Sequence, residues 1–168
     1  MKNFLNNIEF PEFAKDNKLN ISTLLMNNEK VVPDDLMAAT IASVLYTNKE
    51  DKLLDLFLNE ANLTEELIFA AKAAANIMKM NNIYYRGKHF LGNDYEDQQA
   101  KLRMGIYTKH GIDKKYFEFI SLAVSFVNGC EFCVKSHSKL LEKEGMSKVQ
   151  VHEALRIASI INTLRLNY

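Results

Sequence analysis

Apolar residues recur every three to four positions along most of this chain, and short polar stretches interrupt them. That spacing is typical of helices that bury one face, and no segment shows the strict alternation of a strand. Helix-starting signals precede several of the apolar segments, for example Pro33 with two aspartates, Thr64 with two glutamates, and the capping-box pattern that begins at Ser147. The expected helices cover residues 36–46, 52–60, 64–80, 114–128, 130–144 and 147–162.

The segment between the third and fourth expected helices, residues 81–112, is rich in glycine and polar residues. We expect a connector there that contains one or two short helices. A weak internal similarity relates residues 34–80 to 113–162, with Thr64–Ile77 aligning on Ser147–Ile160. The sequence therefore predicts an all-α fold of one domain, residues 1–168, built from two related helical halves.

Composition narrows the range of partners. Lys plus Arg and Asp plus Glu are both 21, so the formal net charge is zero. A chain without net charge has no overall field that would attract a polyanion, which disfavours nucleic acid and anionic membranes as partners. The opening MKNFLNNIEF has no signal-peptide pattern, and the apolar segments contain charges, so we expect no membrane span and a cytoplasmic location.

The two cysteines, Cys130 and Cys133, lie together directly after Gly129, at the expected start of a helix. Free backbone N–H groups and the helix dipole favour a thiolate there, and a separation of three residues brings the two sulfurs within disulfide reach. His137 lies one turn beyond Cys133 on the same face, where it can accept a thiol proton. Glu131 opposes thiolate formation, so we expect its side chain to point to solvent.

Three interpretations of this cluster remain open from the residues alone. The cysteines can be small core residues, or they can bind a metal together with His137 and either Glu118 or His152. The third interpretation, dithiol redox chemistry, fits the position of the pair best. Attached haem is excluded, because Val134 occupies the position that a haem attachment motif reserves for histidine.

Glu118 is an acid among apolar residues of the preceding helix, where a charge is costly without a partner. It is either an ordinary acid near a helix start or a partner of His137. In a straight helical hairpin Glu118 lies about 16 Å before the turn and His137 about 10 Å after it. On this estimate, contact between them requires a kink, a tilt between the helices or a bridging water.

The pattern Glu118-x11-Cys130-x2-Cys133-x3-His137, set in LAVSFVNGCEFCVKSH, resembles the signature of the AhpD alkylhydroperoxidases, in the carboxymuconolactone decarboxylase-like superfamily. FAKDNKLNISTLL (13–25), MNNIYYRGKHFLGNDY (80–95) and LRMGI (102–106) fit the same family. The resemblance thus covers nearly the whole chain in order. One departure is Phe132, because some members of the family have a histidine between the cysteines.

The resemblance implies an antioxidant thiol peroxidase that reduces alkyl hydroperoxides and regenerates the peroxiredoxin AhpC. Cys133 would be the attacking thiolate, Cys130 its disulfide partner, and His137 with Glu118 the proton relay. Dihydrolipoamide would supply electrons, through a lipoyl-bearing acyltransferase and lipoamide dehydrogenase, and no metal or tightly bound cofactor would be needed. The family also implies a homotrimer or a multiple of one.

Two other functions compete with the peroxidase. A cofactor-free decarboxylase of a lactone acid belongs to the same superfamily but needs no cysteine pair. A non-enzymatic helical zinc module would hold metal and have no exchangeable thiols.

Overall fold

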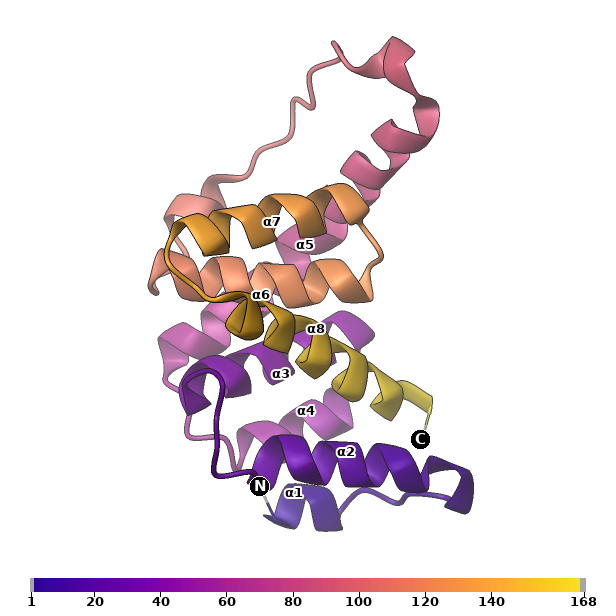
Figure 1. Ribbon diagram of the computed structural model, residues 1–168, viewed down its shortest axis with the longest axis vertical. Coiled ribbons are helices and arrows are strands. Elements are labelled where there is room, and N and C mark those ends of the chain that lie inside the picture. The colour runs from indigo at the N-terminus through magenta and orange to yellow at the C-terminus, as the bar shows by residue number, and fades with distance from the viewer. Residues whose placement is uncertain (1, 167–168) are drawn as a thin grey trace.

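The described part of the chain, residues 2–166 of a computed structural model, is entirely helical. Figure 1 shows the helices stacked in layers, with the N-terminal helices at one end of the molecule and α6 and α7 toward the other. The elements are α1 Lys2–Asn6, η1 Glu12–Ala14, α2 Lys15–Met26, α3 Asp34–Asn48, α4 Asp51–Leu58, α5 Glu65–Leu91, η2 Asn93–Tyr95, η3 Gly105–Thr108, α6 Lys114–Val127, α7 Glu131–Lys143, α8 Lys148–Asn162 and η4 Thr163–Leu166, where η denotes a 3₁₀ helix.

Helices α3 and α6 form the centre of the fold. Each packs against the other, and both contact α5 and α8. Most residues of α3 are buried, including three hydroxyl side chains. Ser43 donates a hydrogen bond to the Ala71 carbonyl at 2.9 Å and Thr40 donates one to the Leu36 carbonyl at 2.7 Å, so these buried polar groups are satisfied.

The sequence signals located most helices correctly. The ends of α3, α4, α6, α7 and α8 lie within two residues of their expected positions. Thr64 accepts a hydrogen bond from the Leu67 N–H at the start of α5, and Ser147 forms a complete capping box at the start of α8. These local caps satisfy backbone donors that no preceding turn can bind. The N-terminal helices α1 and α2 had not been predicted.

The expected connector over 81–112 was wrong in its first third. Helix α5 continues to Leu91, for 27 residues, and ends at Gly92, whose φ is +85°. Gly87 lies inside the helix, where one glycine costs only about 1 kcal/mol. Buried Asn82 and partly buried Arg86 make long-range hydrogen bonds on this stretch, and those contacts outweigh its weak helix signal. The rest of the segment contains the two short turns η2 and η3.

The end of α5 and η2 extend beyond the other helices (Figure 1). The apolar side chains of Phe90 and Leu91 are exposed there. Within the described residues, none of the helices is both long and apolar enough to cross a membrane.

Candidate active site

The turn between α6 and α7 places the cysteine pair. Gly129 has φ +66°, a left-handed conformation that glycine adopts without strain. Its N–H donates to the Phe126 carbonyl at 3.1 Å, and the Cys130 N–H donates to the Ser125 carbonyl at 3.1 Å. This is the Schellman pattern of a helix end, and it directs Cys130 straight into the next helix.

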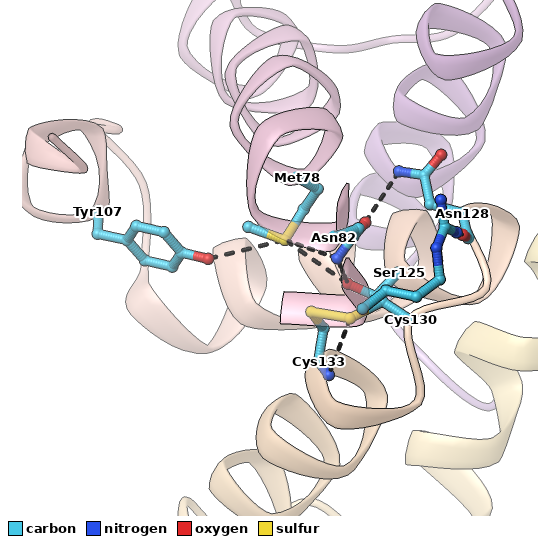
Figure 2. Close-up of a disulfide and its surroundings, with 8 residues drawn as sticks. Met78, Asn82, Tyr107, Ser125, Asn128, Cys130 and Cys133 are labelled. Atoms are coloured by element: carbon cyan, nitrogen blue, oxygen red, sulfur yellow. Dashed lines mark hydrogen bonds between the residues drawn. A yellow bond between two sulfur atoms is a disulfide. The ribbon is translucent and has the colours of Figure 1, made fainter. Parts of the chain in front are cut away.

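Cys130 caps α7, and the pair lies in the first helical turn as expected. Its Sγ accepts a hydrogen bond from the Cys133 N–H at 3.3 Å. The two cysteines form a disulfide with a Cα–Cα distance of 5.3 Å (Figure 2). The structure therefore represents the oxidised state, and it confirms that the spacing brings the sulfurs within bonding reach.

The two sulfurs differ in surroundings. Cys130 is completely buried, whereas Cys133 is 5% exposed and lines a pocket of about 390 Å³. An incoming molecule in that pocket meets Cys133 first. The pocket lining also includes Glu118 and His137, so it brings together three of the four predicted site residues.

His137 and Glu118 are in direct contact. His137 Nδ1 lies 2.5 Å from Glu118 Oε2, and both side chains are buried. No bridging water is needed, because the axial estimate ignored the reach of the two side chains. The contact occupies Nδ1 of the imidazole, which leaves Nε2 as the nitrogen that can serve a thiol. Glu118 thereby has the partner that its burial requires.

The two residues between the cysteines, Glu131 and Phe132, are both exposed. Glu131 is exposed and pairs with Lys135, which holds the pKa of its carboxyl below the usual value through that hydrogen bond and charge. The carboxylate points to solvent as expected. Phe132 is 56% exposed and stacks on Tyr85 of α5, with ring centroids 5.1 Å apart and planes 18° apart. Both rings line the pocket beside Cys133.

A buried hydrogen-bond network, which the sequence analysis missed, fastens the turn to α5. Asn82 donates to the Ser125 hydroxyl at 3.0 Å and accepts from the Asn128 amide at 2.8 Å (Figure 2). Arg86 donates to the Asn128 carbonyl one residue before Gly129. These bonds fix the turn that presents Cys130. A signal was present in the sequence, since Asn82 and Arg86 lie one helical turn apart after an alanine-rich apolar stretch.

Tyr107 lines the pocket and is another residue that the sequence analysis missed. It reaches the pocket from η3 and packs edge-on against Phe117. Burial, and secondly the charge of Glu118, raises the pKa of its phenol. Figure 2 shows the ring extending toward Met78 and the disulfide. Nothing in the local sequence marks Tyr107, because its contacts are with Met78 and Phe117, which are distant in the chain or belong to another helix.

Metal binding was one alternative to redox chemistry, and the arrangement of the described side chains tests it. Across residues 2–166, no group of three or more His, Cys, Asp or Glu side chains is arranged to hold a metal ion. His152 is exposed on α8 and is absent from the pocket lining. The chemistry that the cluster supports is thiol–disulfide exchange with an adjacent imidazole.

Comparison with known proteins places this arrangement in a family. Residues 93–164 match the carboxymuconolactone decarboxylase family. The alkyl hydroperoxide reductase AhpD of Corynebacterium kroppenstedtii is 43% identical over 153 residues, which cover 90% of this chain and 87% of that protein. The chain belongs to the AhpD family. AhpD of Maricaulis maris is 43% identical over 159 residues, covering 93% and 91% of the two chains. AhpD of Coxiella burnetii is 40% identical over 160 residues, covering 93% and 90%.

Membership of the AhpD family agrees with the resemblance drawn from the signature residues and with the all-helical fold. These relatives match about nine-tenths of this chain, so the similarity extends well beyond the cysteine hairpin.

Proposed function

We propose that this protein is a thiol peroxidase and disulfide reductase that reduces alkyl hydroperoxides through the Cys130–Cys133 pair. The observation that carries the proposal is the placement of Cys133, at the start of α7 and in one pocket with the Glu118–His137 pair. The names of the relatives support the same reaction class, because they are alkyl hydroperoxide reductases.

The first half of the cycle oxidises the protein. His137 accepts the proton of the Cys133 thiol, and the Glu118 carboxylate stabilises the resulting imidazolium. The thiolate attacks the terminal peroxide oxygen. A sulfur–oxygen bond forms, the oxygen–oxygen bond breaks, and the leaving alkoxide receives a proton from His137 to give an alcohol. The Cys130 thiol then attacks the sulfenic acid on Cys133, which releases water and closes the disulfide.

The second half restores the dithiol. Dihydrolipoamide attacks the sulfur that the pocket makes accessible, Cys133, and its second thiol closes lipoamide while the cysteines are released. The lipoyl group would come from an acyltransferase recharged by lipoamide dehydrogenase. The peroxiredoxin AhpC would be a disulfide substrate of the same dithiol. The cytoplasm, where reducing systems keep dithiols available, is the compartment for this cycle.

We also propose assembly into a homotrimer or a multiple of one. The support is the C-terminal third of α5, where apolar Ile83, Phe90 and Leu91 are exposed. The end of this helix projects beyond the other helices (Figure 1). Large exposed apolar side chains grouped on one element are typical of association surfaces. Light scattering at several protein concentrations tests the assembly directly.

The test of the proposed function combines redox state, metal content and turnover. Thiol titration should detect two thiols after dithiothreitol treatment and none before it, with no zinc in either sample. With dihydrolipoamide as the reductant, the wild-type protein should consume an alkyl hydroperoxide catalytically. Cys133→Ser should abolish turnover, whereas Cys130→Ser should still react with one equivalent of peroxide. Bound zinc with unreactive thiols would favour the zinc module.

The decarboxylase named by the family match is the second candidate, and the cysteine variants separate it from the peroxidase. A decarboxylase should retain its activity on a lactone acid in Cys130→Ser/Cys133→Ser, because that reaction uses neither sulfur. A peroxidase loses all turnover in the same variant.

A further inference from the structure

The pocket beside Cys133 contains a hydroxyl that the proposed cycle does not use. The Tyr107 hydroxyl donates to the Met78 thioether at 3.7 Å, and a thioether is a weak acceptor. Asn81 of α5 lines the same pocket, and its side chain acts against the rise in the pKa of the phenol. Burial and the Glu118 charge keep the pKa of Tyr107 above its usual value, which means that the hydroxyl stays a donor at neutral pH.

The same pocket has an apolar wall next to the reactive sulfur. Phe132 and Tyr85 stack in parallel and both line it, together with Met78, Met104 and Leu140. More than half of the Phe132 surface is exposed, although the residue lies next to buried Cys133 in the chain. An aromatic surface of this size gains free energy when an apolar group covers it, at about 25 cal/mol per Å².

We propose that this pocket binds an organic hydroperoxide in one orientation, with the Tyr107 hydroxyl donating to the oxygen that leaves as alkoxide and the Phe132–Tyr85 stack covering the organic group. The inference rests on the proposed peroxidase function and adds to it the groups that select the substrate.

The chemistry needs no proton from Tyr107. When the Cys133 thiolate takes the terminal oxygen, negative charge develops on the oxygen that stays with the organic group. In the free protein the Tyr107 hydroxyl donates only a weak hydrogen bond, to Met78. With the hydroperoxide bound it donates to this oxygen instead and stabilises the charge. The proton that converts the alkoxide into the alcohol comes from His137, so Tyr107 ends the step unchanged.

The size of the pocket favours an organic substrate over hydrogen peroxide. About 390 Å³ falls within the range of small-molecule sites. Hydrogen peroxide has no group to cover Phe132 and Tyr85, whereas an aryl or branched alkyl hydroperoxide does. The structure therefore predicts that removing the aromatic wall affects these two substrates differently.

The first experiment measures single-turnover oxidation of the reduced protein by cumene hydroperoxide and by hydrogen peroxide. Tyr107→Phe should slow both reactions about tenfold, the typical kinetic value of one lost hydrogen bond. Phe132→Ala should slow cumene hydroperoxide roughly tenfold and change hydrogen peroxide by less than about twofold. Tyr116→Phe and Phe69→Ala are matched controls outside the pocket lining, and neither should alter either rate.

A second readout separates substrate binding from thiol reactivity. Alkylation of Cys133 by iodoacetamide should proceed at the wild-type rate in Tyr107→Phe and in Phe132→Ala, because iodoacetamide needs only the thiolate. Parallel losses in alkylation and peroxide rates would overturn the proposal, since the variants would then act on the thiol or on the turn. Equal losses for both peroxides in Phe132→Ala would also overturn it.

Binding of cumyl alcohol, the reaction product, makes the inference testable apart from turnover. Calorimetry with the wild-type protein should detect binding that Phe132→Ala weakens about tenfold. Absence of binding to the wild type overturns the pocket assignment, whatever the peroxide rates. Wild-type protein that binds the alcohol but leaves both peroxides unreacted contradicts the proposed function instead, and the assignment of the pocket to an organic ligand survives.

Discussion

Two turns of this protein have nearly the same backbone and entirely different chemistry. The turn from α3 to α4 passes through Lys49 with φ +60°, and the turn from α6 to α7 passes through Gly129 with φ +66°. The following residue in each turn donates its N–H back five positions, Glu50 to the Leu45 carbonyl and Cys130 to the Ser125 carbonyl. The fold thus makes this turn without help from cysteine.

The side chains that follow the two turns differ in a consistent way. Each site residue of the second hairpin has a counterpart in the first hairpin at the same number of residues from the turn. Counted from Gly129 and Lys49, Glu118 corresponds to Ala38, Cys133 to Leu53 and His137 to Phe57. All six side chains are buried. An apolar set is therefore sufficient to build such a hairpin, as the first one shows.

On the proposed function, the second hairpin is the one that gives up stability for chemistry. A buried acid–imidazole pair gains little over apolar residues of similar volume, because removing both groups from water costs free energy. Cys133 and the Glu118–His137 pair also border a pocket, whereas Leu53 and Phe57 belong to the apolar core.

The largest expected effect is on the relay of the second hairpin. His137→Gln should slow peroxide reduction near neutral pH by roughly 10²–10⁴-fold, and by much less at high pH, where the thiol ionises unaided. Glu118→Gln should cost less, and the double variant should be little worse than His137→Gln alone, because coupled residues are non-additive. The pH–rate profiles of the three variants provide the measurement. Additive losses would mean that the two residues do not act as one relay.

The corresponding residue of the first hairpin should matter only for stability. Phe57 is completely buried and meets Phe4 edge-on at 5.3 Å. Phe57→Ala should lower the free energy of unfolding by about 3–5 kcal/mol through the cavity it leaves. Urea denaturation gives this value, and the peroxide rate of the folded variant should equal that of the wild type. A selective loss of rate at full stability would contradict a purely structural hairpin.

Replacing Glu118 and His137 with the corresponding residues of the first hairpin should separate stability from activity. Glu118→Ala with His137→Phe introduces the residues found at Ala38 and Phe57. Replacing a buried pair with apolar groups should raise the free energy of unfolding by about 1–4 kcal/mol, while peroxide turnover is lost. Denaturation and activity assays on the same sample check both. A less stable variant would show that the pair contributes to holding the hairpin together.

The smallest expected effects concern the two left-handed residues. Lys49→Gly should stabilise the protein by roughly 0.5–1 kcal/mol, because glycine adopts a positive φ freely. Gly129→Ala should destabilise it by about 1–2 kcal/mol, the usual cost of a left-handed residue with a side chain. Among the described residues, only Arg86 lies near the added methyl group, at 3.8 Å, so the conformation rather than a clash decides the result. Thermal unfolding measures both changes in stability. If both substitutions stabilised the protein, or both destabilised it, the left-handed backbone conformation would not be the cause.

Local patterns predicted the helices that begin and end on local signals. Thr64, Ser147 and Gly129 act within one turn of their own positions, so their roles follow from neighbouring residues alone. The length of α5 could not be predicted in this way. Its last three turns are held by hydrogen bonds from Asn82 and Arg86 to residues more than forty positions later.

The candidate site shows the same division between local and long-range information. The sequence by itself determined that Cys130 and Cys133 share a helix start and that His137 follows on the same face, since helical geometry fixes residues so close in the chain. Only the tertiary structure decided that Glu118 meets His137 directly. It also decided that Asn81, Tyr107 and Phe132 line one pocket with Cys133. Those contacts depend on how α5, α6, α7 and η3 pack together, and packing is a property of side-chain shapes across the whole chain rather than of any local pattern.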